Sequence, residues 1–517
     1  MSLIAFLDRG MSLAPGRVGY VKDTESWTFQ QSYDVTCRVA RALNAEGLAC
    51  ETKCAVLAAN DPLAWFCVLG VWRAGLTWVP LNPRGAPIEH SELINGFDVE
   101  VLFFQRAFAP SIEAIRVQCP RLRVLVCLDG ELSYAKTFDG FCGAFPALKP
   151  DRYPAEEDLA AIMPTGGTTG APKGVMLTHR NLSLSVANNI INTPYQPGDE
   201  IVNLAAAPMT HTAGFLTLSA TARGGKVVVM TKPDPVSLLD LVCGARVTEF
   251  FLPPTVIYRL LEMPGIESRD FSRLRYFMYG AAPMSVEKLR EALKVFGPVM
   301  LQGYGQTEAP GSIAFLRPGD HFRGRVIAEE YRLSSCGLPS VLNTTAILDE
   351  DGRPVRRGDT GEICVRGDIV MKGYYKQPEK TAETIVDGWL HTGDLGHVDG
   401  EGYLHITDRK KDVIITGGFN VYPSEVEQVL WSHPAVLDCA VIGVPDGHWG
   451  EAVKAVIELK PGAAVSSEEL IAMCKEKVGS VKAPKTVDFE PLPRSPVGKV
   501  LKKDIREKYW RNAERRI

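Results

Sequence analysis

The amino-acid sequence predicts an α/β protein whose large N-terminal domain contains mostly parallel sheets sandwiched by helices. The main reason is a series of continuous Val, Leu, Ile and Phe runs before residue 310, as strands buried on both faces of a parallel sheet require. Helix-like segments lie between many of these runs, which is the order of elements in βαβ units. Beyond residue 340, short strand-like runs alternate with Asp- and Gly-rich turns and predict a small antiparallel β part.

The first βαβ-like unit covers residues 54–81. Residues 54–59 are apolar and predict a buried strand, and Asn60-Asp61-Pro62 is typical of a capped helix start with proline in the first turn. The apolar helix that follows ends at Ala74, and residues 76–80 predict the next strand. Further parallel strands are predicted at 99–104, 122–128, 226–230, 247–252, 274–279 and 299–302, and antiparallel strands at 345–348, 361–366 and 403–407.

A charged run, Asp408-Arg409-Lys410-Lys411-Asp412, divides the chain near its C-terminal end. The 517 residues are too many for one ordinary domain, and the residues after this run are enough for a compact one. We therefore expect an N-terminal domain at 1–408, a hinge at 409–412 and a small, mobile α+β domain at 413–517.

The composition is that of a soluble globular protein, with 45% hydrophobic and 23% charged residues. The net charge of −4 implies no electrostatic attraction to nucleic acid. The most hydrophobic run, residues 62–72, is too short to span a bilayer, and no signal peptide is apparent. Twelve scattered cysteines without a C-x-x-C pair favour a reducing compartment, so we expect a cytoplasmic protein without a transmembrane segment.

A glycine- and threonine-rich stretch, residues 165–174, lies between two strand-like runs. Glycines leave backbone N–H groups free to face an anion, and threonine hydroxyls and a lysine add donors and positive charge. A Walker A loop is excluded because Pro172 interrupts the helix start and Gly174 replaces the required Ser or Thr. The stretch predicts a polyphosphate site, and a flexible turn is the structural alternative.

Three further loops follow predicted strands, at residues 208–214, 280–283 and 303–308. Ligands of open parallel sheets bind outside the carboxyl ends of the strands, so these loops are candidate site segments. In the last loop, Tyr304 offers a flat face for a base, Thr307 can donate to a phosphate oxygen, and Glu308 is a carboxylate suited to Mg²⁺. A packed aromatic ring and a surface acid are the structural alternatives for Tyr304 and Glu308.

These residues resemble the AMP-forming adenylate superfamily, which includes acyl-CoA synthetases, luciferases and peptide adenylation domains. The resemblance runs from about residue 20 to residue 510 and departs at Gly166, where many members have serine. It rests on seven motifs in the order of the family, at residues 165–174, 208–214, 303–308, 389–394, 408–412, 417–425 and 493–499.

The resemblance implies a two-step reaction. A carboxylate attacks the α-phosphorus of Mg·ATP, which releases pyrophosphate and gives an acyl-adenylate. A thiol then attacks this mixed anhydride and releases AMP. The implied cofactors are ATP, Mg²⁺ and coenzyme A as co-substrate, and the implied partner is a small-molecule carboxylic acid, with a homodimer left open.

By resemblance, Lys499 bridges the carboxylate and the α-phosphate, where two anions meet and fixed positive charge is needed. Thr307 would bind the α-phosphate, and Glu308 would be the metal ligand for Mg²⁺. The residues implied to hold the β- and γ-phosphates are Thr165, Gly166, Gly167, Thr168, Thr169, Gly170 and Lys173.

The same resemblance assigns the adenosine. Asp394 would accept hydrogen bonds from both ribose hydroxyls, Arg409 would also reach the ribose, and Tyr304 would stack on adenine. The residues implied near the base are Gly280, Ala281, Ala282, Gln302 and Gly303.

For the second step, the resemblance implies that the C-terminal domain turns about Lys411. The Gly417-Gly418 turn would then line a narrow pantetheine tunnel, and a hairpin turn is its structural alternative. His211 would separate the acyl pocket from this tunnel, and no second ligand at a suitable spacing supports a metal role for it.

The identity of the acyl group is left open between a medium- or long-chain fatty acid and an aromatic acid, with a preference for fatty acid. The implied pocket segments are small and contain no Arg or Lys, which disfavours a dicarboxylate. An adenylation enzyme that loads a carrier protein is the main alternative. No acidic residue suited to an amino group follows His211 and no carrier domain follows Lys499, so coenzyme A is favoured. A luciferase-like oxygenase is not excluded by motif, and a non-catalytic nucleotide-binding protein would leave the Lys499 segment idle.

Overall fold

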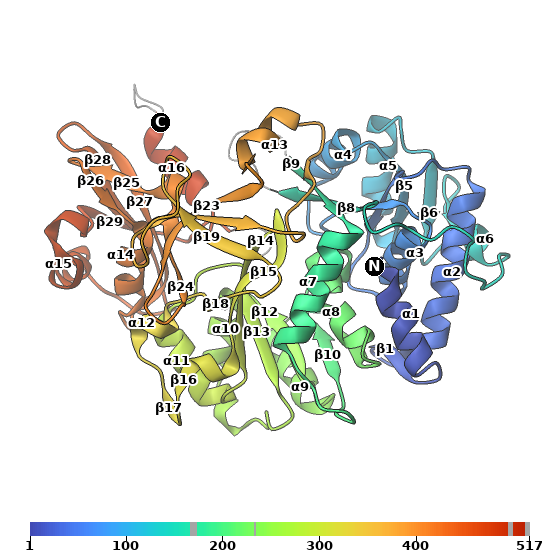
Figure 1. The fold of residues 1–517 in the computed structure, drawn as a ribbon, viewed down its shortest axis with the longest axis horizontal. Helices are drawn as coiled ribbons and strands as arrows, with labels where there is room; N and C mark the ends of the chain where they lie inside the picture. Colours follow the sequence, from blue (N-terminus) through green and yellow to red (C-terminus); the bar gives the residue numbers. More distant parts are fainter. Residues whose placement is uncertain (166–172, 232–233, 495–499, 512–517) are drawn as a thin grey trace.

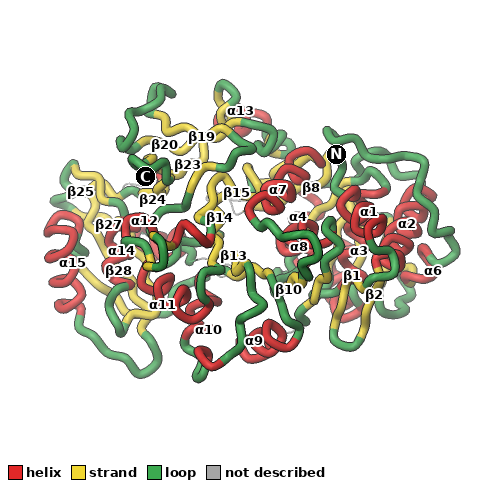
Figure 2. Tube along the Cα trace, turned by 60° about the horizontal axis from the view of Figure 1, so that its bottom comes forward, coloured by secondary structure: helices red, strands yellow, loops and turns green. Residues whose placement is uncertain are grey.

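A computed structural model of residues 1–517 describes the chain except for residues 166–172, 232–233, 495–499 and 512–517 (Figure 1). The side chains of His211 and Thr212 also lie outside the description. Two large sheets form the body of the molecule, and two smaller antiparallel-rich sheets follow in the sequence. Helix α15 (Ser467–Lys482) lies at the opposite end of the molecule from α2 (Phe29–Ala45) and α6 (Phe138–Cys142) (Figure 1, Figure 2). The predicted fold class is confirmed.

The first large sheet is parallel from β1 to β14, and antiparallel strands lie at both edges. Within the described residues the strands follow the order β18 (Leu338–Pro339), β15 (Ala309–Leu316), β14 (Met300–Gln306), β13 (Tyr276–Gly280), β12 (Glu249–Leu252), β10 (Val202–Ala205), β11 (Lys226–Val229), β1 (Val18–Lys22) and β2 (Glu25–Thr28). Because the parallel strands end at one edge, the loops that follow them lie along that edge.

The second large sheet is parallel from β8 to β7 and ends in two antiparallel strands. Within the described residues its order is β21 (Gly373–Tyr374), β9 (Lys173–Thr178), β8 (Leu159–Thr165), β4 (Thr77–Pro80), β3 (Lys53–Leu57), β5 (Val99–Phe104), β6 (Val124–Cys127) and β7 (Lys136–Thr137). Strands β8 and β9 form a hairpin whose ends flank residues 166–172.

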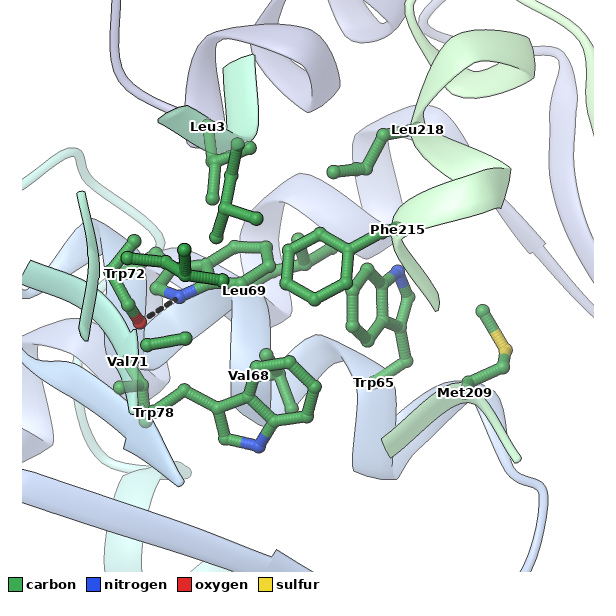
Figure 3. Close-up of a cluster of buried hydrophobic side chains, with 14 of the residues drawn as sticks. Leu3, Trp65, Val68, Leu69, Val71, Trp72, Trp78, Met209, Phe215 and Leu218 are labelled. Atoms are coloured by element: carbon green, nitrogen blue, oxygen red, sulfur yellow. Dashed lines mark hydrogen bonds between the residues drawn. The ribbon is translucent and has the colours of Figure 1, made fainter. Parts of the chain in front are cut away.

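Helix α3 (Pro62–Arg73) is the centre of the largest apolar core, which contains side chains from both large sheets. The helix is apolar on almost every side, as a buried helix must be. Ring centroids in the core lie 5.5–6.5 Å apart, and the indole of Trp72 donates to the carbonyl of Ala160 at 2.8 Å (Figure 3). The four rings belong to Trp65, Trp72, Trp78 and Phe215.

The remaining helices of the N-terminal part cover the two large sheets. Helices α9, α10 and α11 share a second apolar core with β12 and β13, and α4 and α5 share a third with β3 and β5. These helices are α1 (Ile4–Leu13), α4 (Pro87–Gly96), α5 (Ala109–Gln118), α7 (His179–Asn192), α8 (Gly214–Thr221), α9 (Pro235–Gly244), α10 (Pro254–Leu261), α11 (Val286–Phe296), α12 (Glu330–Leu333) and α13 (Pro378–Thr384).

Two smaller sheets complete the fold. An antiparallel sheet contains β19 (Thr344–Leu348), β20 (Gly361–Arg366), β22 (Ile385–Val386), β23 (Trp389–Val398) and β24 (Leu404–Arg409), and a short hairpin joins β16 (Phe322–Arg323) to β17 (Val326–Ile327). The C-terminal sheet has its own apolar core. The strands and helices of this C-terminal part are β25 (Ile414–Thr416), β26 (Phe419–Val421), α14 (Pro423–Trp431), β27 (Val436–Asp446), β28 (Gly450–Leu459), α15, β29 (Thr486–Phe489) and α16 (Lys502–Trp510).

The structure differs from the expected elements at two places that matter for function. Strand β14 continues through Gln306, so most of the predicted loop at residues 303–308 is extended and paired with β15. Arg409, expected as the first hinge residue, is the last residue of β24 and pairs with Asp394. A 3₁₀ turn then covers Lys410–Asp412. Among the described helices, none has the length and apolar character needed to cross a membrane.

His179 connects the N-terminal residues to the start of α7. Its side chain is fully buried, and Nδ1 accepts a hydrogen bond from the N–H of Leu3 at 3.3 Å. Burial lowers the pKa of His179 from 6.5 to about 4, with a smaller opposing effect from Asp158. The imidazole is therefore neutral in the folded protein at neutral pH, as its role as an acceptor requires.

We expect the stability of the protein to fall as the pH drops from 6.5 to 4, because the unfolded chain then binds a proton that the folded His179 does not. The difference in pKa corresponds to about 3 kcal/mol at the end of this range. His179→Gln keeps a neutral acceptor and should show a shallower decline of the urea midpoint between these pH values. Equal declines for the two proteins would contradict this account, whereas a residual decline is expected from His321, whose pKa burial also lowers to about 4.

Gly417 and Gly418 form the turn between β25 and β26, and both have positive φ angles, 56° and 82°. A Cβ atom at Gly417 would lie 2.5 Å from the indole ring of Trp449, whereas a Cβ at Gly418 would meet nothing within 4 Å. The Gly417 N–H also donates to the Trp449 carbonyl at 2.9 Å. Both glycines therefore serve the turn, and Gly417 also allows Trp449 to approach.

Gly418→Ala should cost about 1–2 kcal/mol for a side chain in the left-handed conformation. Gly417→Ala should cost more, because the added methyl group overlaps the Trp449 ring. The two differences can be measured by thermal unfolding in the wild-type and Trp449→Ala backgrounds, as a double-mutant cycle. The excess for Gly417→Ala should disappear without the indole, and an excess that persists would exclude the proposed clash.

Candidate active site

Tyr304, Asp394 and Arg409 meet where β14 reaches the antiparallel sheet. The Tyr304 hydroxyl donates to Oδ2 of Asp394 at 2.7 Å, and Nε of Arg409 lies 3.4 Å from Oδ1 of the same carboxylate. Pairing of β23 with β24 sets Asp394 opposite Arg409. Tyr304 and Asp394 are buried, whereas Arg409 is partly exposed. Three residues predicted to bind adenosine are thus brought together from distant parts of the sequence.

The contact between Tyr304 and Asp394 has a defined direction. Burial raises the pKa of the Tyr304 hydroxyl well above its usual value, and the negative charge of Asp394 raises it further. The hydroxyl therefore keeps its proton and donates, because a carboxylate can only accept. This contact fixes the hydroxyl end of the Tyr304 side chain.

The glycines around Tyr304 allow three strands to approach closely. A Cβ atom at Gly303 would lie 2.6 Å from Oγ of Ser312 on β15, and one at Gly280 would lie 2.4 Å from the carbonyl oxygen of Gly303. Both distances are too short for real contacts. The packing of β13 against β14 therefore requires glycine at position 280, where the close atom belongs to the backbone, whereas at Gly303 a rotation of the Ser312 hydroxyl would relieve the contact.

Gln302 and the loop after β13 complete this side of the site. The Tyr279 hydroxyl lies 3.3 Å from Oε1 of Gln302 and 3.1 Å from Nε2 of His321. Because Nδ1 of His321 lies 2.8 Å from a carbonyl oxygen, it carries the proton and Nε2 can accept. Ala281 is exposed with φ of 65°, a left-handed conformation that costs about 1–2 kcal/mol, and Ala282 is half-buried beside it.

The predicted phosphate loop begins and ends on a β-hairpin. Thr165 and Lys173 are register partners in β8 and β9, and Oγ1 of Thr165 lies 3.5 Å from the Lys173 carbonyl oxygen. The predicted loop residues Gly166, Gly167, Thr168, Thr169 and Gly170 lie outside the described residues.

Tyr374 connects the phosphate loop to the predicted magnesium ligand. Its hydroxyl donates to Oε1 of Glu308 at 2.8 Å, and Nζ of Lys173 lies 5.1 Å from the centroid of its ring. Strand β21 pairs with β9 and holds Tyr374 beside the hairpin. Tyr374 was not among the predicted residues, because nothing in the sequence distinguishes it from Tyr375, whose hydroxyl donates to Asp98 instead.

Lys411 adds positive charge near Lys173. Burial lowers the pKa of Lys411, and the charges of Arg409, Arg506 and Lys173 lower it further, against the opposing effect of Asp412. The Arg506 guanidinium, on α16, donates to the Lys411 carbonyl at 3.3 Å. Asp412, whose Oδ1 lies 3.7 Å from the Arg506 guanidinium, balances part of this positive charge.

Glu308 can serve as a magnesium ligand. Among the described residues, no three His, Cys, Asp or Glu side chains are grouped so that they could hold a metal by themselves. Mg²⁺ is usually bound by one or two carboxylates together with substrate phosphates and water. A single carboxylate next to the phosphate hairpin fits this mode, and Thr307 lies half-buried beside it in the turn after β14.

The other predicted residues lie apart from this group or outside the description. The backbone of His211 belongs to the π-helical turn Met209–Ala213, a form of turn that is frequent at functional sites, and its side chain is outside the described part. Lys499 is outside the described residues. Gly417 and Gly418 lie in the C-terminal hairpin beside Trp449.

Comparisons with known proteins show the family of this chain. A family model described as "AMP-binding enzyme" matches residues 7–375, and one described as "AMP-binding enzyme C-terminal domain" matches residues 425–499. The medium/long-chain-fatty-acid–CoA ligase FadD8 of Mycobacterium tuberculosis is 35% identical over 510 residues, which cover 94% of this chain and 86% of that protein. Feruloyl-CoA synthase of an Amycolatopsis species is 37% identical over 478 residues, 91% of this chain and 92% of that protein.

A solved structure extends the similarity to the whole fold. The amide bond synthetase McbA from Marinactinospora thermotolerans superposes with a TM-score of 0.88 at 31% identity, over 98% of this chain and 100% of that chain. The chain therefore belongs to the family of AMP-binding enzymes, within the adenylate-forming superfamily that includes the acyl-CoA synthetases.

Proposed function

We propose that this enzyme is an AMP-forming acid–CoA ligase that activates a carboxylic acid as an acyl-adenylate and transfers the acyl group to the thiol of coenzyme A. The observation that carries the proposal is the position of two groups along the strand ends. Tyr304, Asp394 and Arg409 form one group, and the Tyr374–Glu308 pair beside Lys173 forms the other. An adenosine next to a chain of phosphates needs one polar group for the ribose and one cationic group for the phosphates.

Asp394 and Arg409 are proposed to hold the ribose. The carboxylate can accept from both ribose hydroxyls, and the partly exposed guanidinium of Arg409 can donate to a ribose oxygen. Tyr304 is tied through its hydroxyl to Asp394, which leaves the face of its ring for adenine.

The cationic group formed by Lys173, Arg409, Lys411 and Arg506 is proposed to stabilise the negative charge on the phosphates. Lys499 is proposed to bring the carboxylate and the α-phosphate together during adenylation. Mg²⁺, when bound at Glu308, would polarise the phosphate oxygens as a Lewis acid. In the second half-reaction, the segment around Lys411 is proposed to act as the pivot of the C-terminal domain, and the Gly417-Gly418 turn to receive pantetheine.

The acyl group is proposed to be a medium- or long-chain fatty acid or an aromatic acid. Of the relatives named above, one is a medium/long-chain-fatty-acid–CoA ligase and one is a feruloyl-CoA synthase. Gly280 says little about the size of the acyl pocket, because the backbone of β14 already requires glycine at that position. The choice between the two acid classes therefore depends on a direct measurement.

The proposal is tested by AMP release from ATP with octanoate, dodecanoate, hexadecanoate, benzoate and ferulate, each with and without coenzyme A. We expect one class of acid to give sustained AMP release only when coenzyme A is present. Lys499→Ala should lower acyl-adenylate formation by about 10²–10⁴-fold and leave thioester formation from supplied acyl-adenylate nearly unchanged. Activity that requires a carrier protein instead of coenzyme A would overturn the assignment of the acceptor.

Tyr374→Phe should weaken adenylation by about 10-fold or more, because it removes a hydrogen bond to an ionised carboxylate that is proposed to bind Mg²⁺. The half-saturating Mg²⁺ concentration for acyl-hydroxamate formation should rise. Tyr375→Phe is the matched control, since it removes the same kind of hydrogen bond from the neighbouring residue to Asp98. Equal effects of the two substitutions would argue for a general loss of structure and against a role at the metal.

A further inference from the structure

Glu362, on β20, accepts hydrogen bonds from three donors close in sequence to Asp394 and Arg409, the two residues proposed to hold the ribose. Its Oε1 accepts from the N–H of Gly393 at 3.0 Å. Its Oε2 lies 3.1 Å from Nδ1 of His391 and 3.3 Å from Nζ of Lys410. The side chain is only 11% exposed, so these donors rather than water satisfy the carboxylate.

Two of the three donors are sequence neighbours of the residues proposed to bind ribose. Gly393 directly precedes Asp394, and Lys410 directly follows Arg409. A single carboxylate therefore contacts both the strand that carries Asp394 and the segment that carries Arg409.

The strand around Asp394 is bulged, and Glu362 caps the bulge. Cys364 pairs with His391 and Glu362 pairs with Leu395, so β23 has two more residues than β20 between the same two pairs. Such bulges redirect side chains near active sites. The N–H groups that the bulge removes from the ladder find other acceptors: that of Gly393 reaches Glu362, and that of Asp394 reaches Oγ1 of Thr392 at 3.1 Å.

The charge on Glu362 is maintained by its neighbours. Burial alone would raise the pKa of this carboxyl, but the hydrogen bonds from His391 and Gly393 and the charge of Lys410 lower it overall. Glu362 is therefore ionised at neutral pH and can only accept, which matches three donors and no acceptor. A glutamine of the same shape would present an NH₂ group to at least one of them.

We propose that Glu362 is a positioning residue for ribose recognition, which holds the bulge at Gly393 so that Asp394 faces the ribose hydroxyls. Lys410 extends the same contact to the segment after Arg409. The inference rests on the ribose role proposed above for Asp394. If Glu362 has this role, loss of its carboxylate should lower kcat/KM for a nucleotide with ribose hydroxyls. The kcat/KM for a nucleotide without these hydroxyls should change much less.

The test compares kcat/KM for ATP and for 2′,3′-dideoxy-ATP in acyl-hydroxamate formation by the full-length enzyme. The wild type should prefer ATP strongly, since a site that hydrogen-bonds hydroxyls rejects an analogue without them. Glu362→Gln should reduce this preference about 10-fold or more, mainly through a higher KM for ATP. Glu362→Asp, which keeps the charge on a shorter side chain, should lie between them, and Glu350→Gln, an exposed control in the turn after β19, should match the wild type.

The ratio of the two kcat/KM values distinguishes a positioning role of Glu362 from a loss of folded protein, because a partly unfolded enzyme loses activity with both nucleotides alike. Wild-type preference in Glu362→Gln, or in Glu362→Asp if the first variant does not fold, would overturn the proposal. Asp394→Ala is the reference for a site without the ribose ligand. If Asp394→Ala keeps the full preference for ATP, the ribose role of Asp394 fails, and that result is distinct from any result obtained with Glu362.

Discussion

The burial of helix α3 between the two large sheets is the constraint on which the rest of the structure depends. The helix is apolar on nearly all sides, so it is stable only when both sheets cover it. Its single charged residue, Arg73, is fully buried, and its guanidinium donates to Asp8 at 2.5 Å and to Thr36 at 2.9 Å. These contacts attach the two N-terminal helices α1 and α2 to the same core. Because the shared core holds the two sheets together, it also sets the position of the end of β14, in one sheet, relative to the β8–β9 hairpin, in the other.

The candidate site is assembled where these strand ends meet the antiparallel sheet. Each key side chain is held by a neighbour on a different element: Tyr304 by Asp394, and Glu308 by Tyr374. Glu362, on β20, accepts a hydrogen bond from Gly393 in the bulge of β23 that precedes Asp394. Polar groups in partly buried positions need such partners, because an unpaired carboxylate there is costly. The same pairing that stabilises these groups also fixes their orientation, so the stability of the fold and the geometry of the candidate site depend on the same contacts.

The charge distribution separates the two ends of this site. On the adenosine side, one buried carboxylate is balanced by a hydroxyl and a guanidinium. On the side proposed for the phosphates, burial lowers the pKa of Lys411, and the charges of Arg409, Arg506 and Lys173 lower it further against the opposing effect of Asp412. Bringing cations together is unfavourable by itself, and a polyphosphate would relieve the repulsion. Lys411 lies in the 3₁₀ turn before the C-terminal sheet, so its charge belongs to the segment proposed as the pivot.

The candidate site residues stay predictions that rest mainly on the resemblance of seven motifs to the adenylate superfamily. The sequence by itself determined the class of the fold and the core helix, because continuously apolar strand and helix segments are a local pattern that follows from burial. It did not predict α1 and α2, and it ended β14 too early, since pairing with β15 extends that strand through Gln306. Only the tertiary structure decided that Tyr374 and not Tyr375 faces Glu308, that Glu362 caps the bulge before Asp394, and that the Gly303 carbonyl requires glycine at position 280. These are contacts between residues far apart in the chain, and no local pattern encodes them.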